Sequence, residues 1–169
     1  LNMFCYTGGF SLAALRGGAR LVHSVDSSAR AVELSLKGVA DNFPNDERHR
    51  SFVEDAFRFL DGMESVYDLI ILDPPAFAKH RGALKQALIG YRRLNQRAFE
   101  KIMPGGLLFT FSCSQVVAKE QFRTVLFTAA ARAGRSVKIL HQLHQPADHP
   151  VNIFHPEGEY LKGFVLAVD

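Results

Sequence analysis

Two segments with strongly apolar centres restrict the fold of this chain more than any other feature of its sequence. Residues 68–72 (Asp-Leu-Ile-Ile-Leu) run into Asp73-Pro74-Pro75, and residues 107–112 follow the turn Pro104-Gly105-Gly106. A strand whose apolar centre shows no polar alternation is covered on both faces, which is typical of a parallel sheet. Between the two segments, residues 84–102 carry apolar side chains at helical spacing. We therefore predict parallel strands joined by a helix, the basic unit of an α/β fold.

The rest of the chain continues this alternation. We expect strands at residues 1–6, 20–26, 51–54, 67–73, 107–112, 137–144 and 160–168, and helices at residues 10–16, 28–42, 56–61, 84–102 and 117–133. The polar loop between the last two strands leaves no room for a crossover helix, so this pair should be antiparallel. The pattern predicts a Rossmann-like, doubly wound and mostly parallel sheet with a C-terminal antiparallel strand pair. Residues 1–169 should form one domain, and because no turn or cap precedes the first strand, we expect its beginning to lie upstream.

Composition disfavours several classes of protein. The chain has 169 residues, 47% of them hydrophobic and 22% charged, which is typical of a globular domain that buries a core without disulfides. No apolar run approaches the roughly 18 residues of a membrane span, and no export signal begins the chain, so we predict a cytoplasmic protein. The two cysteines, Cys5 and Cys113, have no partners at metal-ligand spacing, and we predict no metal site.

A glycine-containing turn after the first strand is the first candidate ligand site. Tyr6-Thr7-Gly8-Gly9 lies between that strand and the next helix, where glycines let a ligand approach the backbone and the helix offers unpaired amides. The motif is not Gly-x-Gly-x-x-Gly and has no phosphate-binding lysine, which disfavours a dinucleotide or a nucleoside triphosphate. A purely structural turn is the alternative.

Acidic residues follow the second and third strands. Asp26, which precedes Ser27, could accept hydrogen bonds from both hydroxyls of a ribose. Asp55, which precedes Ala56, could accept from an adenine amine, or it could cap the next helix instead. Three ligand-competent groups at successive strand ends are less expected by chance than any one of them. We therefore interpret the glycine turn and these two acidic dipeptides as one cofactor site.

Two reactive side chains follow the buried strands. Asp73 ends one strand and Cys113 ends the next; if these strands are neighbours, both side chains face one pocket beside the cofactor, and Asp73 could contact the cofactor too. A thiolate that adds to C6 of a pyrimidine makes C5 nucleophilic, so this pair suits methylation of cytosine C5 with Cys113 as the nucleophile. Asp73 could bind the N3 or N4 edge and stabilise the developing charge. The base that removes the C5 proton is not identified. The alternatives are an inert buried thiol and a turn aspartate, and we place Cys5 in the core.

Substrate contacts are predicted near the same segment and along the following helix. The residues concerned are Pro74, Pro75, Phe77, Arg92, Arg93 and Arg97. The Phe77 ring could stack on a base or simply pack within the protein. Residues 79–101 are rich in lysine and arginine and contain a single acid, Glu100. This basic stretch suits RNA phosphates, although a solvated helix face would look the same.

Six segments together resemble the bacterial 23S rRNA cytosine-C5 methyltransferase family. They are Asn2-Met3-Phe4-Cys5-Tyr6-Thr7-Gly8-Gly9-Phe10, Asp73-Pro74-Pro75-Ala76-Phe77, Gly90-Tyr91-Arg92-Arg93-Leu94-Asn95, Thr110-Phe111-Ser112-Cys113-Ser114, Ala147-Asp148-His149-Pro150 and Pro156-Glu157-Gly158-Glu159-Tyr160-Leu161-Lys162-Gly163. The segments occur in family order and cover essentially the whole chain.

The resemblance implies a class I methyltransferase fold, S-adenosylmethionine bound at the glycine turn, and a catalytic cysteine at Cys113. It also implies an N-terminal RNA-binding module of PUA type, which lies outside this sequence. Many RNA C5 methyltransferases have a second cysteine after the Asp-Pro motif; here Ala76 and Phe77 follow, which leaves the product-releasing base unassigned. The implied partner is ribosomal RNA, 23S rRNA in particular, whereas the sequence allows a homodimer without specifying one.

Two other functions remain open. An exocyclic-amine methyltransferase also uses an acid or amide followed by Pro-Pro and an aromatic residue, although Phe77 comes one position late and that chemistry needs no cysteine. The second is a non-catalytic nucleotide-binding module of Rossmann type, which preferential binding of NAD would favour.

Overall fold

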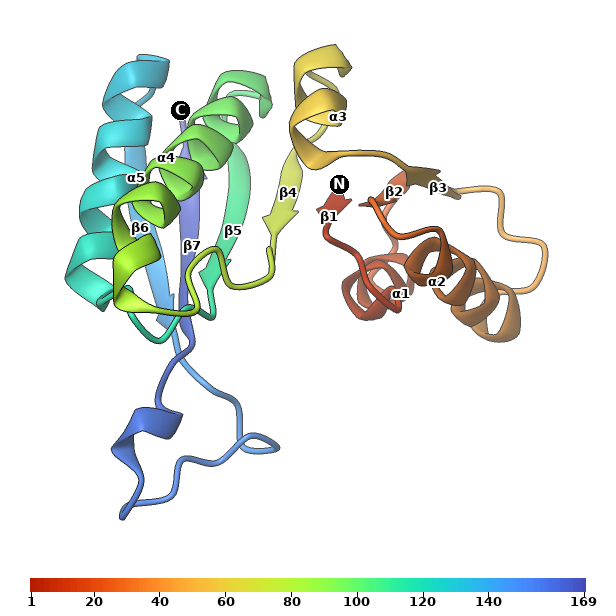
Figure 1. Cartoon of the computed structure of the whole chain (residues 1–169). Helices are drawn as coiled ribbons and strands as arrows, with labels where there is room; N and C mark the ends of the chain where they lie inside the picture. Colours follow the sequence, from red (N-terminus) through yellow and green to blue (C-terminus); the bar gives the residue numbers. More distant parts are fainter. The chain divides into compact units, whose positions relative to one another are not determined.

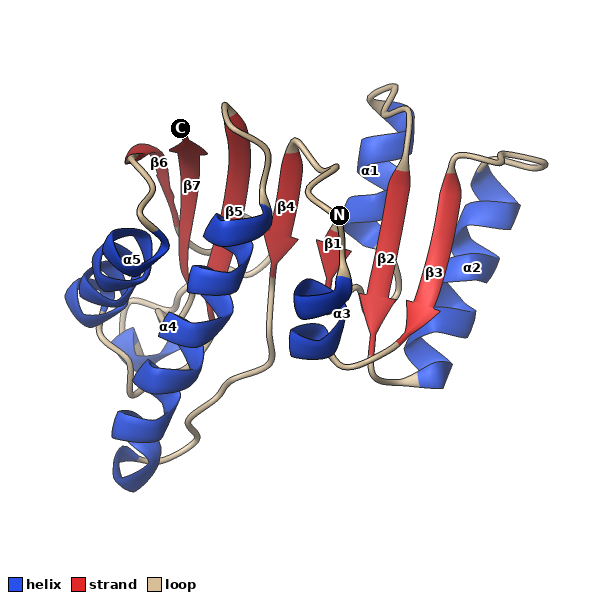
Figure 2. Cartoon of the chain, turned by 90° about the horizontal axis from the view of Figure 1, so that it is seen from above, coloured by secondary structure: helices blue, strands red, loops and turns tan.

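The computed structural model describes all 169 residues, which form two compact units, Leu1–Glu64 and Ser65–Asp169. In the first unit, three parallel strands pair in the order β3-β2-β1. Its elements are β1 (Asn2–Met3), α1 (Gly9–Arg16), β2 (Val22–Asp26), α2 (Ala29–Asn42), β3 (His49–Val53) and α3 (Ala56–Gly62). Helices α1 and α2 lie on one face of this sheet and α3 on the other (Figures 1 and 2), as doubly wound folds require.

The second unit contains a four-stranded sheet in the order β4-β5-β7-β6. Its elements are β4 (Leu69–Leu72), the short 3-10 helix η1 (Arg81–Ala83), α4 (Leu84–Lys101), β5 (Gly106–Ser112), α5 (Lys119–Ala133), β6 (Val137–Leu143), η2 (Pro156–Gly158) and β7 (Lys162–Val168). Strands β4 and β5 are parallel, whereas β7 runs antiparallel to both β5 and β6. The predicted α/β class, with mostly parallel strands and an antiparallel C-terminal pair, is confirmed.

The first strand is shorter than the sequence predicts. We expected residues 1–6 to be extended, but β1 ends at Met3 because Phe4 and Tyr6 adopt positive φ angles of 58° and 45°. The amide of Cys5 still donates to the carbonyl of Val25 at 3.1 Å, so the chain stays beside β2 while it turns. A non-glycine residue with positive φ is uncommon, and apolar composition alone does not reveal it.

A chain of buried polar groups joins the elements of the first unit. The Asn2 amide donates to Ser11 Oγ at 2.9 Å, Ser11 Oγ lies 2.6 Å from Ser24 Oγ, and Ser24 Oγ lies 2.8 Å from the His49 ring. These four side chains come from β1, α1, β2 and β3. A buried polar group without a hydrogen-bond partner destabilises the folded state. These hydrogen bonds therefore fix how the helix and the three strands pack together.

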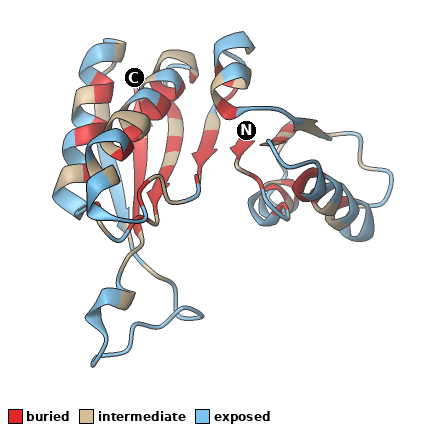
Figure 3. Ribbon diagram, viewed as in Figure 1, coloured by how far each residue is buried: buried red, intermediate tan, exposed pale blue.

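Aromatic side chains fill the core of the second unit. Tyr91 and Phe99 of α4, Phe122 of α5 and Phe164 of β7 are fully buried. The Tyr91 and Phe122 rings meet edge to face at 5.3 Å, and Phe122 and Phe164 lie 5.9 Å apart. Figure 3 shows the buried residues on the strands and on the helix sides that face them, while the segment between β6 and β7 is exposed.

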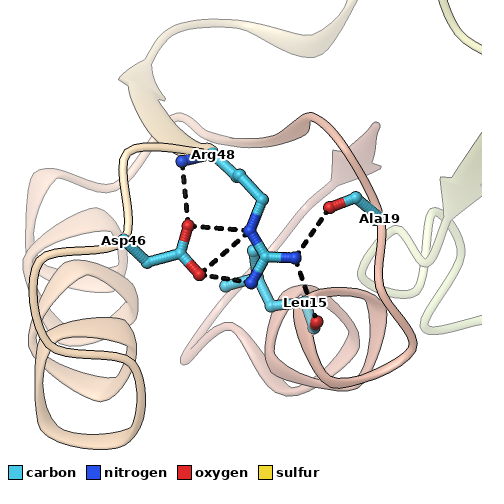
Figure 4. Close-up of polar contacts among 4 residues, drawn as sticks. All are labelled: Leu15, Ala19, Asp46 and Arg48. Carbon is cyan, nitrogen blue, oxygen red and sulfur yellow. Dashed lines mark hydrogen bonds and ion pairs between the residues drawn. The ribbon is translucent and has the colours of Figure 1, made fainter.

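The Arg48 side chain ties the loop before β3 to the end of α1. Its guanidinium pairs with the Asp46 carboxylate and donates to the carbonyls of Ala19 at 3.1 Å and Leu15 at 3.5 Å (Figure 4). Hydrogen bonds from Arg48 lower the pKa of Asp46 from its ordinary value of 3.8 to about 2. The folded state therefore stabilises the ionised form of Asp46 more than the unfolded chain does.

This pKa shift predicts a defined pH dependence of stability. The Asp46 contribution should be fully present above its unfolded pKa near 3.8 and should disappear as the pH falls toward 2. Asp46→Asn should lower the denaturation midpoint at neutral pH, and its difference from the wild type should shrink below pH 4. Urea unfolding of both proteins across this pH range measures the difference. A difference that stays constant down to pH 2 would contradict the assignment.

Candidate functional site

The turn between β1 and α1 is built around Gly8. This residue is the N-cap of α1 and has a φ of 86°, in the left-handed region that disfavours side chains. A Cβ atom added to Gly8 would lie 2.6 Å from Ser35 Oγ on α2. The close approach of the turn to α2 therefore requires glycine, which is the structural alternative noted for this motif.

Gly9, the first residue of α1, has different surroundings. A Cβ atom added there would meet no protein atom within 4 Å, so the space in front of it is open. No side chain caps the N-terminus of α1, so its first amides lack a side-chain acceptor. Tyr6 and Thr7 are exposed beside it. An open space bordered by uncapped amides fits a ligand with hydrogen-bond acceptors.

Asp26 holds the same turn in place. One carboxylate oxygen accepts from the Tyr6 amide at 3.1 Å, and the other accepts from the Ser28 amide at 2.9 Å. Each carboxylate oxygen has a second lone pair, so both can still accept a hydroxyl proton. Ser27, between these contacts, is exposed. The structure thus brings Tyr6 and Asp26 together as predicted, and it gives Asp26 a structural role that the sequence did not reveal.

Asp55 caps α3, which was one of its two predicted roles. Its Oδ1 accepts from the amides of Phe57 at 3.0 Å and Arg58 at 3.1 Å. Both bonds end on Oδ1, so Oδ2 remains able to accept from a ligand. Ala56 is only 7% exposed and offers little surface to a ligand. The cofactor role of these two residues stays a prediction.

Asp73 and Cys113 follow neighbouring strands of the second unit. Strands β4 and β5 pair in parallel with Leu72 opposite Thr110, so the two residues leave the sheet at the same edge. Burial raises the pKa of the Asp73 carboxyl. Burial also raises the pKa of the Cys113 thiol, and the Asp73 charge raises it further. The expectation that these strands are neighbours is confirmed.

Cys113 borders a pocket rather than lying sealed in the core. The pocket has a volume of about 260 Å³ and is lined by Ala76, Ala78, Lys79, Cys113, Gln115 and Tyr160. The thiol is half-buried and donates to the Pro74 carbonyl at 3.8 Å. Pro74 is buried, whereas Pro75 is exposed. Cys113 is therefore in contact with a pocket that opens to the surface. Cys5, by contrast, is buried, and burial raises its pKa to about 11.

Phe77 packs inside the second unit. Its ring stacks on Tyr91 with centroids 4.5 Å apart and an interplanar angle of 25°. A Cβ atom added to Gly90 would lie 3.0 Å from this ring, so glycine makes room for Phe77 and α4 continues through it without interruption. Tyr91 in turn bonds Ser114 Oγ at 3.0 Å. The packing role considered for Phe77 is therefore present, and its contact with a base stays a prediction.

Lys162 is a site residue that the sequence analysis did not single out. It is only 8% exposed, begins β7, and lies opposite Ser112. Its Nζ donates to the carbonyl of Ser114 at 2.6 Å. A lysine inside the apolar run of a terminal strand was the available signal, but such a residue usually lies on the solvent face of a strand.

The predicted basic face of α4 is present. Arg93 and Arg97 are exposed one turn apart, and Arg92 is half-buried with a 3.4 Å hydrogen bond to Gln96. Arg97 also pairs with Glu100 at 2.8 Å. The face therefore presents cationic groups, of which Arg97 is paired with an acid.

None of the helices combines the length and apolar composition needed to cross a membrane.

Comparison with known proteins indicates where such an arrangement occurs. Residues 1–158 match the sequence model of a family described as S-adenosylmethionine-dependent methyltransferase. The chain is 42% identical to ribosomal RNA large subunit methyltransferase I of Tolumonas auensis and 40% identical to the Salmonella arizonae protein of that name, over 98% and 99% of its length. It spans 43% and 42% of those proteins, less than half of each.

A solved structure agrees with this comparison. The crystal structure of SMU.776 complexed with SAH (S-adenosylhomocysteine) matches with a TM-score of 0.83 and 28% identity. The match covers 98% of this chain and 44% of that one.

Gly8 and Gly9 form a matched pair that separates folding from ligand binding. Gly8→Ala should lower the free energy of unfolding by roughly 1–3 kcal/mol, because it strains the left-handed backbone and collides with Ser35. Gly9→Ala should leave stability nearly unchanged but weaken S-adenosylhomocysteine binding at least about tenfold, because its methyl group enters the open space. Urea unfolding and calorimetry measure the two effects. Normal affinity in Gly9→Ala would remove that space from the ligand site.

Proposed function

The chain belongs to the S-adenosylmethionine-dependent methyltransferase family, and on that premise we propose that it methylates C5 of a cytosine in large-subunit ribosomal RNA. The observation that carries the proposal is Cys113, whose thiol borders an open pocket beside the Asp73-Pro74-Pro75 segment. Methylation of a ring carbon needs such a nucleophile, whereas methylation of an amine does not.

The class of substrate comes from the relatives. Proteins at 40–42% identity are named for methylation of large-subunit ribosomal RNA, and the family motifs around Asp73 and Cys113 point to cytosine in 23S rRNA. Because the chain spans less than half of those relatives, the RNA-binding module implied by the resemblance belongs to this proposal too. The exposed Arg93 and Arg97 would contribute phosphate contacts from the catalytic domain itself.

The cofactor would be held by the first unit. The uncapped amides of α1 and the open space at Gly9 fit the polar groups of S-adenosylmethionine, and the Asp26 carboxylate fits its ribose hydroxyls. The adenine amine would reach Asp55 Oδ2, beside the backbone of Ala56. When bound, the cofactor supplies an electrophilic methyl group on a positively charged sulfur.

Cys113 and Asp73 would then perform the chemistry on the base. The Cys113 thiolate forms a bond to C6, and the electron pair of the C5–C6 double bond moves into the ring toward N3, the edge at which Asp73 would bind the base. Burial raises the Asp73 pKa, and a carboxyl that takes up a proton can donate to N3. C5 would form its new bond to the methyl group, which S-adenosylmethionine would supply when bound. A general base removes the C5 proton, the C5–C6 double bond re-forms, and the thiolate leaves.

Amine methylation has weaker support. In that chemistry an aromatic ring after the Asp-Pro-Pro motif stacks on the target base, but the Phe77 ring is stacked on Tyr91. A non-catalytic NAD-binding module does not accord with the family match.

The covalent step predicts a trapped complex. RNA that carries 5-fluorocytidine at the target should form a stable adduct with the protein, because fluorine cannot leave as a proton does. Cys113→Ala and Cys113→Ser should abolish both the adduct and turnover, while S-adenosylhomocysteine still binds. Denaturing gels, with mass spectrometry of the digested adduct, identify the attached residue.

Cys5→Ala is the matched control, because Cys5 is buried and should affect stability only. Normal methylation by the Cys113 variants would refute the covalent mechanism. Nucleoside mass spectrometry would then show whether the methyl group is on an exocyclic amine.

The basic face of α4 predicts a change in salt dependence. Replacing Arg93 and Arg97 by Gln should weaken RNA binding and flatten the slope of log affinity against log salt by about 0.7 for each phosphate that the protein no longer neutralises. Arg30→Gln is a suitable control, because Arg30 pairs with Glu33 at 2.7 Å much as Arg97 pairs with Glu100. Equal slopes in the double variant and the wild type would show that this face is only solvated.

A further inference from the structure

A buried lysine lies at the strand edge that carries Cys113. Lys162 starts β7, which runs antiparallel to β5, so the beginning of β7 meets the end of β5. The register sets Lys162 opposite Ser112, the residue before Cys113. Its Nζ reaches the Ser114 carbonyl, the residue after Cys113, at 2.6 Å. The lysine therefore spans the backbone segment that presents the thiol.

The burial of this ammonium calls for an explanation. Lys162 is 8% exposed, and taking a charged amine out of water is unfavourable unless other groups stabilise it. A lysine has three N–H donors, and the Ser114 carbonyl is its one hydrogen-bond acceptor in the structure. A methionine of similar volume would fill the same space without this penalty. The position is thus costly if Lys162 serves packing alone.

The charges around Cys113 show what a cation would do there. Burial and the Asp73 charge raise the pKa of the thiol, which works against formation of a thiolate, whereas the Lys162 charge lowers it. In return, the Cys113 charge raises the pKa of Lys162, which burial lowers. Lys79 also lines the pocket, but it is exposed and water screens its charge.

Uncharged groups complete the surroundings of the thiol. The Tyr160 side chain lines the pocket, and the Tyr91 hydroxyl bonds Ser114 Oγ, which also accepts from the Ala78 amide at 3.3 Å. These bonds hold Ser114 from the side of α4, while Lys162 holds it from β7. Lys162 is the buried cation that acts on Cys113, and it shares a second pocket with the exposed Glu159 and His144.

We propose that Lys162 is a positioning residue for the Cys113 nucleophile: its buried ammonium fixes the backbone of residues 113–114 and provides the positive charge that favours the thiolate. The inference rests on the proposed role of Cys113. The thiol proton leaves to solvent through the open pocket, and Lys162 keeps its own three protons throughout. The buried Lys162 ammonium is screened less by water than an exposed charge would be.

The effect of the Lys162 charge can be measured on the Cys113 thiol itself, without RNA or cofactor. Iodoacetamide alkylates thiolates, so the pH dependence of its reaction with Cys113, followed by peptide mass spectrometry in a Cys5→Ala background, gives the pH midpoint of thiol ionisation. Lys162→Gln keeps a donor for the Ser114 carbonyl but removes the charge. It should move the midpoint upward by about one pH unit, which is about tenfold less thiolate at neutral pH.

Two comparisons separate charge from structure. Lys162→Arg should restore most of the wild-type midpoint, and Lys79→Met should move it by much less than Lys162→Gln, because Lys79 is exposed. An unchanged midpoint in a folded Lys162→Gln protein overturns the proposal. So does a shift of equal size in Lys79→Met.

A reciprocal measurement leaves Lys162 intact, in case its variants fail to fold. The ¹³Cε resonance of Lys162 should titrate at lower pH in Cys113→Ala than in the wild type, because the thiolate no longer stabilises the ammonium. Identical titrations overturn the proposal. The proposed function and the Lys162 proposal are tested by different experiments. The fluorocytidine adduct tests the methylation chemistry, whereas thiol alkylation and the lysine titration test the interaction between the Cys113 and Lys162 charges.

Discussion

The second unit depends on the position of β5 between a parallel and an antiparallel neighbour. Parallel pairing with β4 sets Asp73 and Cys113 at one edge of the sheet. Strand β7 is antiparallel to β5, so the start of β7 lies at the edge of the sheet where β5 ends. Lys162 reaches the same edge for that reason. A wholly parallel sheet would have placed the first residue of its last strand at the far edge.

This geometry combines groups that perturb one another. Burial makes the Cys113 thiol and the Asp73 carboxyl harder to ionise, and it makes the Lys162 amine easier to deprotonate. All three shifts arise from the same low-dielectric surroundings, which also strengthen the interactions among the charges. Removing the charge of Asp73 or of Lys162 should therefore alter the ionisation of Cys113, and single substitutions here are not independent.

The sequence predicted the fold where the local pattern decides it. Unbroken apolar strands, helical spacing in α4 and the short connection before β7 each reflect a constraint within one segment. The first strand was too long in the prediction, because Phe4 and Tyr6 turn the chain in conformations that their residue types do not favour. Cys113 could be found because a thiol at a strand end has a recognisable motif, although its role is still a prediction. Lys162 could not, because its burial follows from pairing with β5 over a distance of about fifty residues along the chain.

Asp26 shows that a binding group can also be part of the scaffold. Its carboxylate accepts the Tyr6 amide of the glycine turn and the Ser28 amide before α2, so the turn and the acid are hydrogen-bonded before any ligand arrives. The conformational entropy of this segment is thus lost during folding rather than during association. A ribose bound at Asp26, as proposed, would find an acceptor already oriented and partly dehydrated. The free energy of ribose binding would then come from the new hydrogen bonds, with little entropy lost in ordering the loop.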